Sequence, residues 1–355
     1  MKILIINPGS TSTKFAVYQS GKIQLEKTLR HSDKDLSKYP TVPEQYHFRS
    51  HLINNSLIEN KQNISSFNGI IGRGGLLKPM AGGIYQINNR MLHDLNQSIF
   101  GEHASNLGAI IANDLSLKAK CPAFIADPVV VDEMGELAKI SGIKDIQRRS
   151  IFHALNQKAV ARKIAWQLNK SYKDSNLIIA HLGGGISVGA HQQGLVIDVN
   201  NALDGDGPFS PERSGSLPMG SLVDMCFSGK FSIQEVKQKL KGKGGLVSYL
   251  NTNDAYEVQK RVGAGDSYAR LIYQAMAYQV SKSIGEMAVV LKGQVDAIVL
   301  TGGIAHDEKY FSTWIKDHTS FIAPVYIFPG EDELQALHDI CIQALSGELT
   351  IKQYL

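Results

Sequence analysis

The chain has 355 residues, a length that favours two domains over one. Hydrophobic residues make up 43% of the sequence and charged residues 20%, which excludes a wholly disordered chain, a collagen and a disulfide-linked scaffold. The net charge of +4 is too small for this length to indicate a nucleic-acid or membrane partner. No export signal and no run of about 18 apolar residues is recognisable, so we expect a cytoplasmic protein.

The first elements in the chain are predicted to be three short strands with tight turns between them. Apolar or alternating runs cover residues 2–6, 15–18 and 22–29. The same succession returns about half a chain later, over residues 177–180, 186–190 and 195–197. The sequence therefore predicts an internal duplication of a whole domain, with a chance resemblance between two glycine-containing turns as the alternative.

Helices and strands alternate between and after these two copies. Apolar residues recur at helical spacing over residues 104–118, 154–168 and 266–292. Short apolar strands are predicted over residues 121–126, 296–300 and 323–328, and a final helix extends to about residue 345. Such alternation of strands and helices predicts the α/β class.

The polar segment 170–176 is expected to join the two domains. The first domain would then comprise residues 1–172 together with the C-terminal helix 331–355, and the second would comprise residues 173–330. The segment 237–245 is rich in Lys and Gly and is expected to be a solvated surface loop and not an anion site.

Three glycine-containing turns follow predicted strands, at Asn7–Lys14, His181–Ser187 and Thr301–His306. Glycine and small hydroxyl residues let backbone N–H groups approach an anion closely. None of the three turns is a Walker A loop or a dinucleotide fingerprint. One such turn is most often a simple hairpin, but three of them at strand ends in a duplicated α/β chain predict a polyphosphate site between the domains.

Four polar residues stand in apolar or glycine-rich surroundings. Arg73 is flanked by glycines and has room to hold a planar anion through two hydrogen bonds, although a surface ion pair is the alternative. Asp127 ends a strand before a proline, where it is either a site carboxylate or a turn-initiating residue. His153 can cap the helix that follows or donate to a phosphoryl group. Arg213 lies in a turn-rich loop that is also typical of a surface.

Five motifs together resemble the acetate kinase family of short-chain carboxylate kinases. They occur in the family's order and span essentially the whole chain: Asn7–Lys14, Gly72–Pro79, Arg148–His153, His181–Gly185 and Phe209–Gly215. The resemblance implies the fold of the sugar kinase, heat-shock chaperone and actin superfamily. In that fold, two duplicated actin-like ATPase (ribonuclease H-like) domains hold a nucleotide in the cleft between them. The resemblance also implies ATP or ADP and Mg²⁺ as cofactors, and a homo-oligomer of at least two subunits.

The resemblance implies catalytic roles for four residues. Arg73 would hold the substrate carboxylate, and Arg213 would be a second active-site arginine. Asp127 would be the active-site aspartate, and His153 would stabilise the transferring phosphoryl group. The residues implied in binding the nucleotide are Asn7, Ser10, Thr11, Lys14, His181, Gly183, Gly184, Gly185, Gly302 and Gly303.

The resemblance places magnesium near Asn7 and an acidic residue before the last helix. Asp332 falls where acetate kinases carry a magnesium-associated glutamate. Because an aspartate has the shorter reach, Glu331 and Glu333 are alternatives. From the residues alone, all three acids can simply complement the dipole of the helix that they precede.

The implied reaction transfers the γ-phosphoryl group of ATP to a short-chain carboxylate, butyrate or a similar acid, and gives an acyl phosphate and ADP. A carboxylate is already ionised at neutral pH, so Asp127 is expected to hold magnesium or a water molecule and not to act as a base. Acetate, propionate and branched acids are alternative substrates, since one methylene changes discrimination by only about 1–3 kcal/mol. A sugar kinase and a non-enzymatic ATP-dependent clamp or filament subunit are the remaining alternatives.

Overall fold

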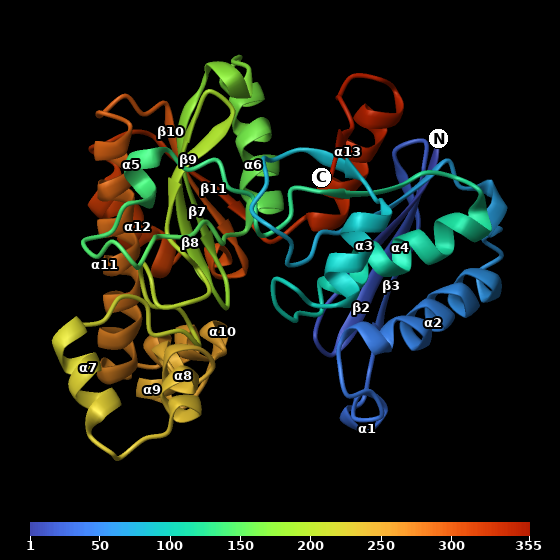
Figure 1. The fold of residues 1–355 in the computed structure, drawn as a ribbon. Helices are drawn as coiled ribbons and strands as arrows, with labels where there is room; N and C mark the ends of the chain where they lie inside the picture. Colours follow the sequence, from blue (N-terminus) through green and yellow to red (C-terminus); the bar gives the residue numbers. More distant parts are fainter. The chain divides into compact units, whose positions relative to one another are not determined.

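The computed structural model describes residues 1–355, and the chain divides into two compact units (Figure 1). The first unit consists of Met1–Val131 with Asp332–Leu355, and the second consists of Asp132–Glu331. The segment 132–172 was expected in the first domain, but in the structure it packs with the second unit. The reason is that helix α6 (Ala154–Gln167) buries Ala161 and Ile164 against the second sheet.

The first unit is built on a seven-stranded sheet with the order β12-β5-β6-β4-β1-β2-β3. Its strands are β1 Lys2–Pro8, β2 Ser12–Gln19, β3 Lys22–Arg30, β4 Gly69–Arg73, β5 Ile84–Gln86, β6 Ala123–Ala126 and β12 Lys352–Gln353. Its helices are α1 Asp33–Leu36, α2 Tyr46–Glu59, α3 Asn89–Asn96, α4 Asn106–Ala119 and α13 Glu333–Leu345, with 3₁₀ turns η1 Pro43–Gln45 and η2 Ile64–Ser66.

The second unit is built on a five-stranded sheet with the order β11-β10-β7-β8-β9. Its strands are β7 Asn176–Leu182, β8 Ile186–Gln192, β9 Leu195–Val199, β10 Ala297–Gly302 and β11 Val325–Pro329. Besides α6, its helices are α5 Glu136–Lys139, α7 Met219–Phe227, α8 Ile233–Leu240, α9 Gly245–Leu250, α10 Ala255–Gly263, α11 Ser267–Val290 and α12 Phe311–Thr319, with 3₁₀ turns η3 Tyr172–Asp174 and η4 Gly303–His306.

The predicted duplication is confirmed by the strand orders of the two sheets. The run β6-β4-β1-β2-β3 of the first sheet corresponds to β11-β10-β7-β8-β9 of the second. In each copy the first strand pairs antiparallel with the next strand and parallel with the strand on its other side. Even an irregularity recurs, because the register shifts between Val17 and Tyr18 in one copy and between Ala190 and His191 in the other.

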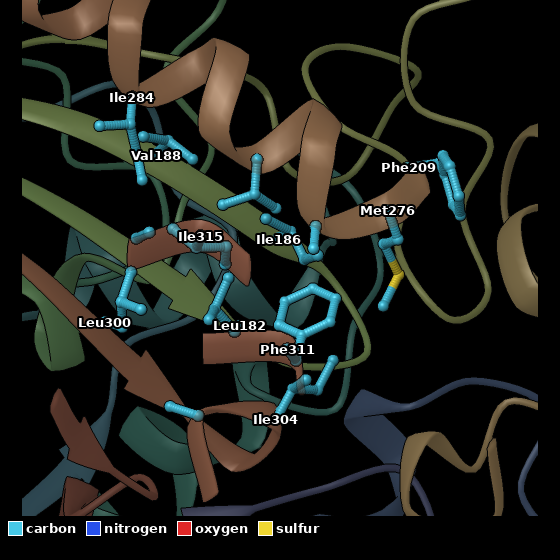
Figure 2. Close-up of a cluster of buried hydrophobic side chains, with 14 of the residues drawn as sticks. Leu182, Ile186, Val188, Phe209, Met276, Ile284, Leu300, Ile304, Phe311 and Ile315 are labelled. Atoms are coloured by element: carbon cyan, nitrogen blue, oxygen red, sulfur yellow. The ribbon is translucent and has the colours of Figure 1, made fainter. Parts of the chain in front are cut away.

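Alternation along the central strands assigns their side chains to opposite helical layers. In β7, Ile178 and Ala180 join the core beneath α11, part of which is shown in Figure 2, whereas Leu177 and Ile179 pack against α6. The first sheet is covered in the same way, by α4 on one face and by α13 on the other. The same alternation therefore predicts on which face of the sheet the side chain of a residue just after such a strand lies.

One expectation of the sequence analysis is wrong in part. The segment 237–245 is not a loop throughout, because its first residues complete α8 and Gly245 begins α9. A capping box at Ser232 and Glu235 fixes the start of α8, and Val236 is buried. Lysines on the exposed side of this short helix hide its periodicity in the sequence.

Helix α4 approaches strand β4 so closely that their backbones touch. A Cβ atom on Gly72 would overlap the carbonyl oxygen of Gly108, and one on Gly108 would overlap the carbonyl oxygen of Arg73. Gly108→Ala is therefore expected to lower the free energy of unfolding by about 1–3 kcal/mol, as measured by urea denaturation.

The matched control is Gly285→Ala in α11, where no atom lies within 4 Å of the added Cβ. This change should raise the free energy of unfolding by about 0.5–1 kcal/mol, because alanine has the higher helix propensity. Equal effects of the two substitutions would show that the contact between α4 and β4 is not tight.

Candidate functional site

Three of the expected site residues form a row across the first sheet. Asn7 and Lys14 are direct partners in the β1–β2 register. The β1–β4 register pairs Ile5 with Ile71, which places Arg73 beside Asn7 at the carboxyl ends of these parallel strands. By alternation, this row shares its face with Ile5, the face that α13 covers.

The acidic residue that contacts this row is Glu333, the first residue of α13. The Asn7 side-chain amide donates to Glu333 Oε2 at 2.6 Å, and Arg73 Nη1 lies 3.1 Å from the same oxygen. Glu333 is buried, with 8% of its surface exposed. Asp332 instead caps α13, where its carboxylate accepts from the Gln335 N–H.

Glu331 belongs to the second unit and has a different neighbour from the two acids that follow it. Its Oε1 lies 2.9 Å from His181 Nε2. Of the three consecutive acids that the sequence offered as magnesium ligands, Glu333 is therefore the one that the structure brings against Asn7.

Asp127 follows β6 and lies next in sequence to Ala126, which pairs with Arg73 in the β4–β6 register. Its carboxylate accepts from the Gly83 N–H at 2.6 Å, and its own N–H donates to the Gly83 carbonyl. The side chain is buried and the backbone has a φ of +37°, which is rare for a residue other than glycine. Such local strain is commonly retained at functional sites.

The first glycine turn connects β1 to β2 and contains the exposed residues Ser10 and Thr11. Lys14, just beyond the turn, forms an ion pair with Glu26 at 2.9 Å and keeps 42% of its side chain exposed. These three side chains are therefore accessible to a ligand.

A buried arginine that was not predicted from the sequence holds this turn through hydrogen bonds to its backbone. Arg49 of α2 donates to the carbonyl oxygens of Gly9, Ser10 and Ser12 at 2.7–2.9 Å. It has no acidic partner, and burial lowers the pKa of its guanidinium to about 10, so it remains a cation at neutral pH. No local pattern marked α2 as a helix, because it has no continuous apolar stripe.

In the second unit, two of the expected residues stack face to face. The rings of His153 and His181 lie 3.7 Å apart at an angle of 12°. His153 occupies the N-cap position of α6, but its side chain makes no capping hydrogen bond there. Its Nδ1 lies 2.9 Å from Ser187 Oγ, and His181 Nδ1 lies 2.8 Å from Asn156 Oδ1.

The second and third glycine turns meet at a pocket of about 350 Å³. Gly183, Gly184 and Gly303 line it together with Tyr256 and Gln259 of α10, Ile304 of η4, and Asp307, which follows η4. The pocket thus combines backbone N–H groups with aromatic and apolar surface, which suits a nucleotide. All of its lining residues belong to the second unit.

Two of the expected glycines serve close packing instead of lining this pocket. A Cβ on Gly185 would overlap Arg213 Nη1, and one on Gly302 would overlap the Leu182 carbonyl oxygen. Gly302 also has a φ of +89°, which side chains rarely tolerate.

Arg213 is largely enclosed next to the second glycine turn. Its Nη1 donates to the Ala202 carbonyl, and burial lowers the pKa of its guanidinium. Its Nε–H is buried without a hydrogen-bond partner, which leaves one donor unsatisfied in the protein alone.

The polar side chains of the first unit fit a magnesium ion that is held mainly by the phosphate oxygens of a nucleotide. No group of three or more His, Cys, Asp or Glu side chains is arranged to hold a metal. Magnesium in phosphoryl-transfer sites commonly takes one or two protein ligands together with water and phosphate oxygens. The Asn7 amide oxygen and the Glu333 carboxylate could supply such a pair of oxygen ligands, but in this structure the amide nitrogen faces Glu333 and the amide oxygen lies 3.4 Å from Arg73 Nη1. Among the helices, none has the length and apolar content that crossing a bilayer requires.

Comparisons with known proteins agree on one family. A model described as the acetokinase family matches residues 139–320. Butyrate kinase 1 of Clostridium acetobutylicum is 54% identical over 353 residues, which is 99% of either chain. Acetate kinase of Porphyromonas gingivalis superimposes with a TM-score of 0.77 at 16% identity, covering 96% of this chain and 99% of its own. A propionate kinase of Francisella tularensis gives 0.74 at 19% identity, covering 95% and 98%. These two structures confirm the actin-like fold.

Proposed function

This chain belongs to the acetokinase family, and we propose that it phosphorylates butyrate or an acid of similar length at the expense of ATP, reversibly. The identity of 54% to a protein named butyrate kinase, over 99% of both chains, is the observation that carries this proposal. The enzyme is an ATP:carboxylate phosphotransferase, and the products are an acyl phosphate and ADP.

The nucleotide is assigned to the pocket of the second unit. Gly183, Gly184 and Gly303 present backbone to it, and Tyr256 and Ile304 offer surface for the base. Ser10, Thr11 and Lys14 are assigned to the phosphates through the first glycine turn, where the buried charge of Arg49 adds to the attraction.

The transfer itself needs positive charge and hydrogen-bond donors at the moving phosphoryl group. The acceptor is already an anion, so the obstacle is repulsion between two anions and not the removal of a proton. Arg73 is assigned to the carboxylate, and His153 and Arg213 to the equatorial oxygens of the phosphoryl group. The unsatisfied Nε–H of Arg213 supports this role, because a buried donor needs an acceptor.

Magnesium would be held by Glu333 and Asn7, and when bound it would neutralise phosphate charge. Asp127 is assigned to orienting a water molecule of this magnesium or binding the ion itself, and not to general-base chemistry. Asp332 and Glu331 are not assigned to the metal, since Asp332 caps α13 and Glu331 pairs with His181, whereas Glu333 contacts Asn7.

The experiment that tests the function measures acyl phosphate, trapped as a hydroxamate. The protein is incubated with ATP, Mg²⁺ and straight-chain acids from acetate to valerate, with isobutyrate included. Glycerol and glucose serve as controls and are followed by release of ADP. A maximum near four carbons is expected. Release of ADP with glycerol or glucose, without hydroxamate, would point to a sugar kinase.

We propose that the protein is a homo-oligomer of at least two subunits, with α7 in the contact between them. This helix has no buried residue, although it is strongly apolar, and Met219, Val223 and Phe227 are 53–87% exposed on successive turns. An apolar helix that its own unit does not cover is typical of a protein interface.

The free cysteines Cys121, Cys226 and Cys341 are consistent with a location in the reducing cytoplasm.

Replacing Val223 and Phe227 by serine is expected to shift the protein to monomers at micromolar concentration. Light scattering coupled to gel filtration measures the mass of each form. Serine at Leu271 and Val289, which are exposed apolar residues of α11, provides a matched control that should leave the mass unchanged. A wild-type protein of 38.8 kDa in solution would contradict the proposal.

A further inference from the structure

A continuous chain of hydrogen bonds lies behind His153 in the second unit. Strand alternation places Ser187, Gly189 and His191 on the face of β8 that α6 covers, because Ser187 pairs with His181. Gln157 stands one helical turn after His153 on α6, so both side chains meet this row. Gln157, Ser187 and His191 are completely buried.

The contacts of Gln157 determine which way its amide points. Its Nε2 donates to the Ser187 carbonyl oxygen at 3.1 Å and to Ser187 Oγ at 2.8 Å. A carbonyl oxygen can only accept, so the amide nitrogen must be on this side. The amide oxygen then faces His191 Nε2 at 2.9 Å. Glycine at position 189 makes room for it, since a Cβ there would lie 2.7 Å from Gln157 Oε1.

His191 supports this orientation from its other side. Burial lowers the pKa of His191 well below its usual value, and the neighbouring charge of Lys158 adds to the effect, so the ring is neutral. Its single N–H must be on Nε2, because the amide oxygen of Gln157 is an acceptor. Its Nδ1 accepts from the Tyr172 hydroxyl at 2.8 Å.

These contacts bear on how Ser187 is used. Its Oγ accepts from Gln157, and a hydroxyl hydrogen directed to His153 Nδ1, 2.9 Å away, would satisfy the donor of Ser187 as well. We propose that Ser187, oriented by Gln157, holds His153 in the tautomer that carries its proton on Nε2. Ser187 and Gln157 are thus positioning residues for His153. Only one part of this inference rests on the proposed function, namely that the Nε2 proton is donated to the transferring phosphoryl group.

A fixed tautomer matters because the two nitrogens of a neutral imidazole have opposite roles. With the proton on Nε2, His153 presents a donor to an oxygen of the transferring phosphoryl group. With the proton on Nδ1, the same nitrogen would present a lone pair, which repels that oxygen. Preorganised donors of this kind contribute about 10²–10³ in rate. Stacking on His181 keeps the ring plane in place while Ser187 fixes the proton.

The tautomer can be observed without any activity. Long-range ¹H–¹⁵N correlation spectra of histidine-labelled protein distinguish a protonated from an unprotonated ring nitrogen, and His153→Gln assigns the signals. In the wild-type protein we expect a proton on Nε2 of His153 and none on Nδ1. A proton on Nδ1, whether alone or on both nitrogens, would overturn the proposal.

Gln157→Glu should reverse the direction of the hydrogen bonds between residue 157, Ser187 and His153, while the side chain keeps nearly the same shape. A carboxylate accepts from the Ser187 hydroxyl, which leaves Ser187 Oγ to accept from His153 Nδ1. The proton of His153 should therefore move to Nδ1 in this variant. An unchanged spectrum in a folded variant would show that Gln157 does not direct Ser187.

Ser187→Ala provides the kinetic test. This variant is expected to fold more readily than Gln157→Glu, because it introduces no charge. We expect kcat to fall about 10–100-fold while the KM values for ATP and butyrate change less than about twofold. Ser187→Thr, which keeps the hydroxyl and suits a strand, should restore most of the loss. A variant with full kcat, or a loss that threonine does not restore, would refute the positioning role. If the wild-type protein proved not to be a kinase, the spectra would still decide the tautomer.

Discussion

Arg73→Gln is expected to lower kcat/KM for butyrate by roughly 10²–10³-fold, with most of the loss in the KM for the acid. The reason is geometric and electrostatic. The Arg73 guanidinium is the cation at the carboxyl end of β4, and it lies beside Asn7 with only one carboxylate, Glu333, in contact. Glutamine keeps a donor but removes the charge and one arm of the planar fork that a carboxylate needs.

The matched control for this prediction is Arg90→Gln on α3. Arg90 also pairs with a carboxylate, that of Asp94, but its side chain is 64% exposed. Asp94 is buried and also accepts from the Tyr354 hydroxyl, so it keeps a partner when Arg90 is replaced, and kcat/KM should change less than about twofold. If Arg73→Gln left the KM for butyrate unchanged and raised only that for ATP, Arg73 would serve the nucleotide and not the acid.

Glu333→Gln is expected to raise the Mg²⁺ concentration for half-maximal activity by at least ~10-fold and to lower kcat. Glu333 is the only one of the three consecutive acids that contacts Asn7, and its neutralisation would also leave the Arg73 guanidinium without its carboxylate partner. Activity is measured against free Mg²⁺ at a saturating concentration of ATP and of butyrate.

Asp332→Asn and Glu331→Gln are the matched controls, because they neutralise the adjacent positions. Asparagine at 332 still caps α13, so the Mg²⁺ dependence should be unchanged. A shift with Asp332→Asn, and none with Glu333→Gln, would move the metal ligand to Asp332. If Glu333→Gln changed only the KM for butyrate, Glu333 would serve to neutralise Arg73 and not to bind magnesium.

The sequence predicted the part of the fold that depends on local patterns. The strands on either side of the glycine turns at Gly9 and Gly183–Gly185 show their apolar runs directly, and the duplication follows from the repetition of those runs. Arg73 could be named because glycines flank it, and Asn7 because it opens a glycine turn in a motif that resembles the family; the strand register then places them side by side.

The remaining site residues depend on contacts between segments far apart in the chain. Glu333 lies 326 positions after Asn7, and nothing in the acidic run 331–333 shows which of its members turns toward the sheet. Arg49 supports a turn some 40 positions earlier from a helix that has no clear periodicity. The boundary near residue 132 was missed for the same kind of reason. The buried pair of Lys158 and Glu133, at 2.6 Å, ties the connecting segment to the second unit.

The central claim is that the carboxylate oxygen of a short-chain acid attacks the γ-phosphorus of ATP. The most direct test uses butyrate labelled with ¹⁸O in both carboxylate oxygens and follows the reaction by ³¹P nuclear magnetic resonance. We expect an acyl phosphate whose phosphorus signal carries the isotope shift of one bridging ¹⁸O, formed in equal amount to ADP. Formation of ADP with unlabelled inorganic phosphate, and no acyl phosphate during turnover, would contradict the claim.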